Sequence, residues 1–468
     1  MRPELQLILA SAPLHTSKPH PNPLLEEREQ EELQAIDTLI PVIEDWNKLA
    51  LLLIDRGTAP LLYRKLPHLK NTELIPAQAQ ELLRKAYYKT VSRNARIYEE
   101  FKGLSAVLQA QNIPFITLKG ICMSEWLYGD TGLRQMSDID ILIQEKDGVR
   151  CLDALHAAGY VSQKEFMVDA FVDAKSQNHF NPLFRNHVMV EIHIRLQNTR
   201  EIYQQNLQEV WKDAVPVTLN GMETLRLELS DMLIHACLHL DKHFVTTHVQ
   251  FTSFNDIVNL LRDIDNGLMT TDNGDRAKNK EQRIKTEEIE NFWERFEAKC
   301  IVQGFTDTVF TYLVLVANYY KAPLPQHLVE KYDSLLNSEI KTRFENFLVG
   351  TENEFIRRGR TKTNIGAHII HLQRLKNPID FLRYVKGVVF PGKEFMISKY
   401  IESQEQRTKN QDGKKKLLII RSALPLGFAK NSKLLIKYWW LWYPYRWYKG
   451  LKGLWYVITK NTLKRNER

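Results

Sequence analysis

Hydrophobic residues recur at helical spacing over most of the chain. Apolar positions three and four residues apart predict helices over residues 25–110 and again over residues 201–400. Within the second region, a polar stretch at 265–284 predicts a mobile loop. Most of the chain is therefore expected to be helical, in two segments that are separated by a region of different character.

The spacing of apolar residues changes between Pro114 and Leu196. The runs MSDIDILI and HVMVEIHIRL alternate between apolar and polar residues, as half-buried strands do, and PFITLKG is a short apolar run ending in glycine. Between them, DGVRCLDALHAAGY has the pattern of a helix. Strands are predicted nowhere else, so we expect an α+β fold. A small mixed β-sheet core over residues 111–200 would be flanked by N-terminal and C-terminal helical segments.

The two ends of the chain differ from its body in composition. Residues 1–24 are rich in proline and polar residues and predict a flexible N-terminal segment. Residues 401–468 form a basic, aromatic-rich tail, with 16 of the 64 Lys and Arg, four of the 56 Asp and Glu, and five of the nine Trp. The whole chain carries a formal charge of +8, so the first 400 residues carry −4. The basic character therefore belongs to the tail.

Composition also bears on the cellular compartment. No run of about 20 apolar residues could cross a bilayer as a helix, and the N-terminus lacks the pattern of a signal peptide. The cysteines are scattered and form no CxxC pair: Cys122, Cys151, Cys237 and Cys300. This usage is typical of a reduced protein, and we expect a cytoplasmic one.

The strand predicted at MSDIDILI carries two acidic residues on one face. Because side chains alternate along a strand, Asp138 and Asp140 point the same way. Two carboxylates this close repel each other unless a cation lies between them, and their oxygens suit Mg²⁺ or Mn²⁺. Glu191, in the later alternating run, could complete a metal site. Taken alone, each of these acids fits a solvated strand face better than a metal ligand.

The order of the motifs is more specific than any one of them. Lys119 and Gly120 lie where the first strand ends and a helix begins, a place where backbone N–H groups and a lysine can hold phosphates. A strand ending in Lys-Gly, an Asp-x-Asp strand and a strand with a third acid describe a metal-dependent nucleotidyl-transfer site. LKGICMSEWLYGDTGLRQMSDIDILI resembles the motif of the nucleotidyltransferase superfamily typified by DNA polymerase beta. The chain is most similar to bacterial nucleotidyltransferase family proteins that carry LKG, then Tyr-x-Asp and Arg before SDIDLLV.

The resemblance extends over about residues 40–400. EDWNKLALLLIDRGTAPLLYRKL resembles that family's N-terminal helices, VEIHIRL its third-acid strand, and SDMLIHACLHLDKH with FNDIVNLLRDI its helical half. The chain departs from the superfamily pattern where Ile121 and Cys122 follow the glycine in place of Gly-Ser, and where the third acid is Glu.

The resemblance implies roles for six residues. The catalytic and metal-binding residues would be Asp138, Asp140 and Glu191. The nucleotide phosphates would meet Lys119 and Gly120, with Arg134 as a second phosphate contact. The cofactor would be Mg²⁺ or Mn²⁺, and the donor a nucleoside triphosphate, with ATP the expected one.

The implied reaction moves a nucleoside monophosphate from the triphosphate to a hydroxyl acceptor and releases pyrophosphate. The sequence leaves the acceptor open among small molecules, glycan-related molecules and proteins. The alternative is a non-catalytic adaptor that keeps the fold and docks through its tail, although three acids in register disfavour it. A transferase acting on nucleic acid is disfavoured by the −4 charge of the first 400 residues, because a phosphate-tracking groove needs cationic walls.

Residues 427–458 of the tail interleave Trp and Tyr with Lys and Arg. This pattern suits a membrane interface, where anionic lipids attract the cations, and hence peripheral attachment at the inner membrane face. It also suits a protein partner. Packing of the aromatic rings on the body is the next interpretation, and single-stranded nucleic acid is the least favoured.

Three histidines on a predicted helix are spaced by four residues: His235, His239 and His243. They would share one helical face, either packed over the sheet or bordering the active cleft, and a zinc site would need a further ligand. His193 lies on the strand face of Glu191 and is expected to support it rather than bind metal. Asp256 is expected to be a paired, buried acid and Cys122 a packing residue.

Overall fold

The computed structural model describes residues 2–13, 23–162, 178–197, 205–246, 251–265, 286–349 and 386. The chain divides into a larger unit, residues 1–160, 184–190 and 205–358, and a smaller one, residues 161–183, 191–204 and 359–468. The tail at 401–468 lies outside the described residues, as does the predicted mobile loop at 265–284 apart from its first residue.

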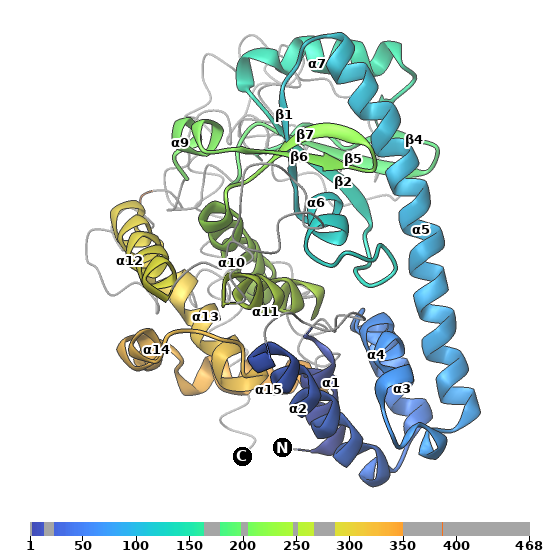
Figure 1. The fold of residues 1–468 in the computed structure, drawn as a ribbon. Helices are drawn as coiled ribbons and strands as arrows, with labels where there is room; N and C mark the ends of the chain where they lie inside the picture. The colour runs from blue at the N-terminus through green and yellow to red at the C-terminus, as the bar shows by residue number, and fades with distance from the viewer. Residues whose placement is uncertain are drawn as a thin grey trace, which may run out of the picture. The chain divides into compact units, whose positions relative to one another are not determined.

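The N-terminal part of the larger unit is helical, as the sequence predicts (Figure 1). Its helices are α1 (Pro3–Ser11), α2 (Pro23–Leu39), α3 (Trp46–Asp55), α4 (Ala59–Lys65) and α5 (Ala77–Ala110), with 3₁₀ turns at Ile40–Val42, Leu66–His68 and Thr72–Leu74. Helix α5 has 34 residues and follows Pro76. Its apolar residues Leu83, Phe101 and Leu104 are buried, so one face of this helix packs along the unit.

Helix α1 lies within the segment 1–24 that the sequence predicts to be flexible. Its residues Leu7 and Ile8 are fully buried. The buried Lys65 Nζ donates hydrogen bonds to the carbonyl oxygens of Ala10 and Ser11, at 3.1 and 3.0 Å. The apolar run LQLILA explains this difference, because it gives a short helix enough apolar surface to dock before the proline-rich stretch begins.

The core is a mixed seven-stranded sheet, which confirms the α+β class with flanking helices. Its strands are β1 (Phe115–Leu118), β2 (Asp138–Ile143), β3 (Val161–Ser162), β4 (Leu183–Arg185), β5 (Val188–His193), β6 (Val215–Leu219) and β7 (Met222–Arg226). Their order is β3-β4-β5-β2-β1-β7-β6. Strand β1 runs antiparallel to β2, with Leu118 opposite Asp140, and parallel to β7. The register therefore brings the end of β1 beside the acids of β2.

The β6–β7 hairpin extends the sheet beyond the region 111–200 in which strands are predicted. Its turn is Asn220-Gly221, and both residues have positive φ, +48° and +75°. This dipeptide is the strongest short-range signal for a two-residue hairpin. The expectation that strands end near Leu196 is corrected here, because β7 joins the sheet by pairing with β1, about 110 residues earlier in the chain.

Helices complete the unit around the sheet. They are α6 (Lys119–Trp126), α7 (Gly148–Ala157), α9 (Leu207–Lys212), α10 (Leu229–Thr246), α11 (Phe251–Asp265), α12 (Thr286–Gln303), α13 (Thr306–Tyr320), α14 (Gln326–Tyr332) and α15 (Ser338–Val349), with 3₁₀ turns at Glu145–Asp147 and Asp333–Leu335. Helix α10 packs against α11 and α13. Phe244 of α10 meets Phe254 of α11 and Phe347 of α15 ring to ring. Among the described helices, none is both long and apolar enough to span a membrane.

Candidate active site

Strand β2 places Asp138 and Asp140 on one face, as its alternation predicts. Ile139, Ile141 and Ile143 are fully buried on the other face and fix the register of the strand. Asp138, the first residue of β2, is half-buried, and the Ser137 hydroxyl donates a 2.9 Å hydrogen bond to its Oδ1. Asp140 is only 2% exposed. The two acids therefore differ in their access to water.

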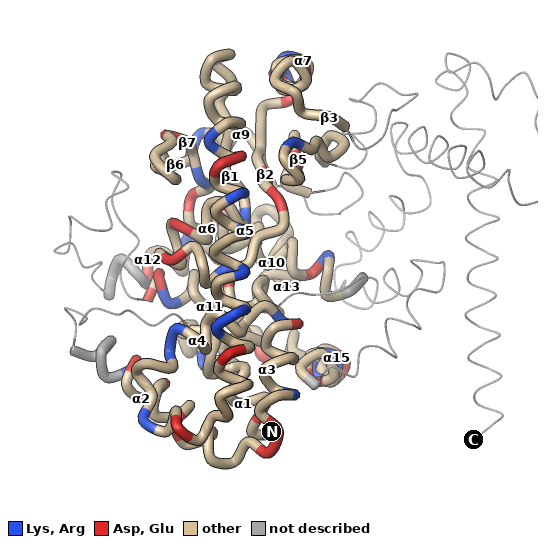
Figure 2. The backbone as a smooth tube through the Cα atoms, turned by 90° about the vertical axis from the view of Figure 1, so that its right-hand side faces the viewer, with Lys and Arg blue, Asp and Glu red and all other residues tan. Residues whose placement is uncertain are grey.

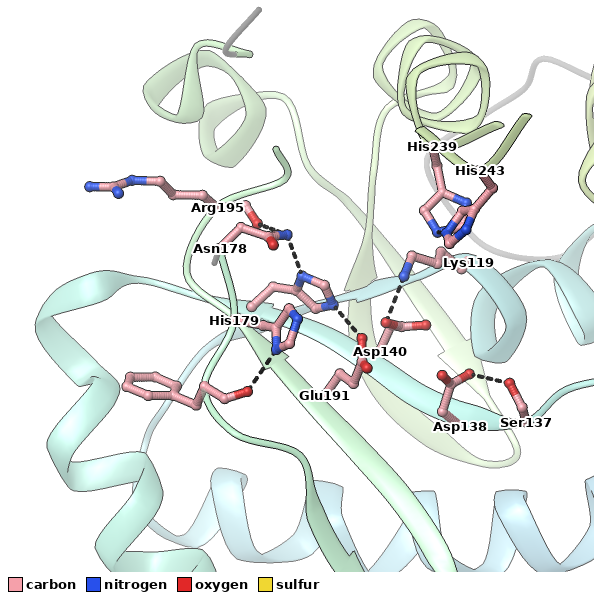
Figure 3. A network of polar contacts seen from close by, with 12 residues as sticks. Lys119, Ser137, Asp138, Asp140, Asn178, His179, Glu191, Arg195, His239 and His243 are labelled. Carbon is pink, nitrogen blue, oxygen red and sulfur yellow. Dashed lines mark hydrogen bonds and ion pairs between the residues drawn. The ribbon is translucent and has the colours of Figure 1, made fainter. Parts of the chain in front are cut away.

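Lys119 faces the buried acid. Its Nζ lies 2.8 Å from Asp140 Oδ1 (Figure 3), and the pair is charge-assisted. Lys119 also has a left-handed backbone conformation, with φ +48°, at the junction of β1 and α6. Such a conformation is costly for a residue with a Cβ and is found chiefly where the surrounding structure requires it. The strained junction thus starts α6 and places the ammonium group beside Asp140.

Three residues are close enough together to hold a metal ion: Asp140, Glu191 and His193. One ligand atom of each lies within 4.8 Å of the others. The carboxylates of Asp140 and Glu191 would hold a divalent cation there, because carboxylate oxygens are the ligands that Mg²⁺ prefers. Asp138, which the sequence also predicts as a ligand, is not part of this group.

Hydrogen bonding to Asn178 determines how His193 can act. The Asn178 side-chain nitrogen lies 3.2 Å from His193 Nδ1 and 3.4 Å from the carbonyl oxygen of Arg195. A carbonyl oxygen only accepts, so the amide nitrogen of Asn178 faces it and also donates to His193 Nδ1. The ring proton of neutral His193 is then on Nε2, which lies 3.6 Å from Glu191 Oε2. In this tautomer the protonated Nε2 faces the Glu191 carboxylate, so the donor set is one of carboxylate oxygens, which fits Mg²⁺ or Mn²⁺.

Arg134 is held by a buried carboxylate. Its Nε and Nη2 donate to the two oxygens of Asp256 at 2.8 and 2.7 Å, and the Tyr128 hydroxyl donates to the same carboxylate at 2.9 Å. Burial alone would lower the pKa of Arg134, but the charge of Asp256 outweighs it and raises the pKa. The expectation that Asp256 is a paired, buried acid is confirmed.

The third nitrogen of Arg134 reaches the predicted phosphate loop. A Cβ atom added to Gly120 would lie 2.7 Å from Arg134 Nη1 and 3.1 Å from Met136 Cγ. Only glycine fits this approach. The structure therefore brings Lys119, Gly120 and Arg134 together at the start of α6, with the guanidinium group packed behind the loop.

Two of the three histidines of α10, His239 and His243, border this site (Figure 3). His239 and His243 have their Nε2 atoms 3.2 Å apart, so one ring donates to the other. Figure 3 shows the two rings beside the Lys119 side chain. Burial lowers the pKa of His239 well below its usual value, and the positive charge of Lys119 lowers it further, so His239 is neutral near pH 7. Of the interpretations left open by the sequence, the one that places this face next to the site is supported.

Two asparagines that support the site are not identified by the sequence analysis. Asn94 of α5 is fully buried, donates to the carbonyl oxygen of Arg134 at 2.8 Å, and accepts from the backbone N–H of Met136 at 3.3 Å. A buried asparagine on the apolar face of a long helix is a signal that could have indicated it. Asn178 lies outside any predicted element, and nothing in the sequence pattern marks it.

Comparisons with known proteins bear on the family of the chain. Among solved structures, the antibiotic-resistance factor ANT(2'')-Ia is 8% identical, with a TM-score of 0.28, over 46% of this chain and 95% of its own. An antigenic nucleotidyltransferase-like protein from Paracoccidioides brasiliensis is 15% identical, with a TM-score of 0.26, over 48% of this chain and 92% of its own. These scores are too low to carry weight. No curated protein matches. The family described as an uncharacterised nucleotidyltransferase matches residues 43–281, just over half of the chain, and the chain therefore belongs to this family.

Proposed function

We propose that this protein is a metal-dependent nucleotidyltransferase that moves a nucleoside monophosphate from a triphosphate, with ATP the expected donor, to a hydroxyl acceptor. The observation that carries the proposal is the group formed by Asp140, Glu191 and His193, with the cation of Lys119 on the same Asp140 carboxylate. Membership of the nucleotidyltransferase family supports the transferase class. An acidic group beside a cationic loop suits a substrate that is itself a metal-bound polyphosphate.

Each residue has a proposed part in this reaction. Asp140 and Glu191 would hold Mg²⁺ or Mn²⁺, with half-buried Asp138 available to a second ion that arrives with the nucleotide. When bound, the metal would offset the charge on the phosphate groups and lower the pKa of the acceptor hydroxyl. Lys119 and the backbone N–H groups at Gly120 would bind the phosphates. Arg134, committed to Asp256, would add positive charge behind the loop through Nη1 rather than bind phosphate as the sequence analysis expects.

The acceptor is proposed to be a small molecule, a glycan-related molecule or a protein rather than nucleic acid. Lys and Arg are interspersed with Asp and Glu over most of the described elements (Figure 2). A nucleic acid acceptor would favour a continuous cationic track instead. This distribution agrees with the −4 charge of the first 400 residues.

Residues 427–458 give the chain a second candidate function. Their interleaved Trp, Tyr, Lys and Arg favour docking on an anionic membrane surface or on a protein partner, which would hold a cytoplasmic enzyme, or a non-catalytic adaptor, at the inner membrane face. The segment lies outside the described residues, so its composition alone supports this proposal.

Thermal unfolding with each nucleoside triphosphate and Mg²⁺ or Mn²⁺ tests the donor site. A ligand at about 100 times its dissociation constant adds roughly 2.7 kcal/mol to the free energy of unfolding. We expect a metal-dependent stabilisation by one nucleotide that is lost in Asp140→Asn and kept in Asp153→Asn, which neutralises an exposed acid of α7. The absence of stabilisation by any nucleotide would contradict the transferase proposal and favour the adaptor.

A further inference from the structure

Arg56 is a buried cation whose charge is poorly compensated by the described residues. Its side chain is 9% exposed, and its ion pair with Asp55 spans 3.8 Å to a carboxylate that is itself 73% exposed. Water screens a pair of this kind, so the pair offsets little of the cost of burying a charge. No described residue accepts a hydrogen bond from the buried Nε atom of Arg56. Buried polar atoms without partners are rare in folded proteins, so this one requires an explanation.

The guanidinium group of Arg56 lies against aromatic rings rather than acids. Its central carbon is 4.7 Å from the centre of the Phe347 ring and 5.6 Å from that of the Phe251 ring. The two rings are fully buried and stack on each other, with their centres 4.9 Å apart. Aromatic faces attract a cation, but they do not replace a carboxylate as the acceptor for its in-plane N–H groups. The rings therefore place Arg56 without satisfying its Nε donor.

Helix α11 adds positive potential at the same place. Phe251 is the first residue of this 15-residue helix, so the ring that contacts Arg56 marks the positive end of the helix dipole. A cation is unfavourable at that end, whereas an anion is stabilised there. Asn255, one turn further along, is fully buried, and neither polar atom of its side chain has a hydrogen-bond partner among the described residues. Because residues four apart share a helix face, Asn255 lies on the same face of α11 as Phe251.

These residues adjoin the loop before β2. A Cβ atom added to Gly57 would lie 3.7 Å from both Gln135 Oε1 and Thr252 Oγ1, so the residue after Arg56 approaches this loop and α11 together. The proposed phosphate contacts of the donor lie instead at the start of α6, whereas Arg56 follows the last residue of α3. The group around Arg56 is therefore built from other elements than the donor site.

We propose that Arg56, with Asn255 and the N-terminal end of α11, binds an oxyanion, a phosphate or carboxylate group, at a site separate from that of the nucleotide. Such a group accepts hydrogen bonds in the plane of the guanidinium group and neutralises its charge. Arg134 provides the contrast, because its Nε donates to the buried carboxylate of Asp256. An oxyanion supplied by a ligand would do at Arg56 what Asp256 does at Arg134. The inference does not depend on the proposed function.

Isothermal titration calorimetry of the full chain tests this site, with inorganic phosphate and acetate as separate probes in a buffer whose only other anion is chloride. We expect the wild type to bind at least one probe saturably; tighter binding of phosphate would indicate a phosphate group, and tighter binding of acetate a carboxylate. In Arg56→Met, which keeps an apolar stem against the two rings but removes the N–H donors, the affinity should fall at least tenfold. Arg84→Met, which removes an exposed arginine of α5, is the matched control and should bind as the wild type does.

A further variant separates this site from the donor site, because inorganic phosphate can also bind at the start of α6. Lys119→Met should keep the binding that depends on Arg56, and if the wild type binds two phosphates, each variant should lose one of them. Binding that is lost in Lys119→Met and kept in Arg56→Met would overturn the proposal, as would the absence of binding to the wild type. If circular dichroism shows that Arg56→Met does not fold, Arg56→Lys replaces it. This variant keeps the charge but not the planar Nε donor, so it should bind the anion more weakly than the wild type, and equal affinity would overturn the proposal.

Discussion

Two buried ion pairs flank the same loop, and they are built differently. Arg134 and Asp256 meet through two parallel hydrogen bonds, with side chains only 10% and 7% exposed and a tyrosine hydroxyl on the same carboxylate. Lys119 and Asp140 meet through one contact, and the lysine side chain is 19% exposed. A planar guanidinium group in a bidentate pair is fixed in orientation, whereas an ammonium group on a flexible stem can change partners. The first pair is suited to holding the loop, and the second to exchange.

The difference also explains where each pair lies. Asp256 belongs to α11 and Arg134 to the segment before β2, so this pair ties the helical half of the larger unit to the loop in front of Asp138. Lys119 directly follows the last residue of β1, and Asp140 lies in β2 opposite that residue. Precise placement of phosphates and metal requires that their surroundings do not move, so an exchangeable pair benefits from a fixed one behind it.

Replacing Asp256, the anion of the Arg134–Asp256 pair, should have the largest effect on stability. Asp256→Ala leaves the guanidinium group of Arg134 buried without its anion, and breaking a buried pair in this way costs about 3–5 kcal/mol. We expect a fall of that size in the free energy of unfolding, measured with urea. Asp265→Ala, in the same helix, is the control. It breaks the ion pair between Asp265 and Arg28, whose side chains are 35% and 37% exposed, and should change the free energy of unfolding by less than about 1 kcal/mol. If Asp256→Ala lowered the free energy of unfolding no more than Asp265→Ala does, the Arg134–Asp256 pair would not stabilise the fold.

Crowding the loop should have an intermediate effect. The Cβ of Gly120→Ala would lie 2.7 Å from Arg134 Nη1, which cannot withdraw while Asp256 holds it. Overpacking of this kind costs about 1–3 kcal/mol, and chemical denaturation measures it. Gly129→Ala is the control, because its Cβ meets nothing within 4 Å and only the φ of +66° opposes it, at roughly 1 kcal/mol. A Gly120→Ala variant as stable as the wild type would mean that the loop and Arg134 are free to separate.

The sequence predicts where Lys119 and Asp140 lie, although it does not predict that they pair, and it predicts less of the Arg134–Asp256 pair. The alternation in MSDIDILI locates β2 and places both acids on one face, and the order of elements brings Lys119 to its neighbour, because each signal lies within a few residues. The Arg134–Asp256 pair joins residues 122 positions apart, which no local periodicity can reveal. The sequence accordingly indicates that Asp256 is a paired acid but not which residue pairs with it, and the family resemblance implies a phosphate contact for Arg134.

Other differences between the predicted and the observed structure also arise from contacts between residues far apart in the sequence. Strand β7 enters the sheet by pairing with distant β1, and the prediction of helices over residues 201–400 does not use the local signal of its Asn220-Gly221 turn. Helix α1 is stabilised by burial of Leu7 and Ile8 and by the Lys65 ammonium group at its last carbonyls, neither of which is visible in nine residues of sequence. Local patterns therefore predict elements, and tertiary contacts decide what those elements hold in place.

Removing the anion of the exchangeable pair should have the smallest effect on stability and a large one on ligand binding. In Asp140→Asn, the ammonium group of Lys119 can reach water along its flexible stem, so we expect the free energy of unfolding to change by less than about 1 kcal/mol. Binding of Mn²⁺ with a nucleotide analogue should nevertheless be lost, because the deepest carboxylate of the group is gone. Asp138→Asn, at the half-buried position of the same strand, should weaken binding less. A loss of stability in Asp140→Asn as large as that in Asp256→Ala would show that both ion pairs are structural and would remove the distinction between them. An Asp140→Asn protein that folds normally but no longer binds Mn²⁺ with the nucleotide analogue would show that the Asp140 carboxylate is needed for binding and not for the fold.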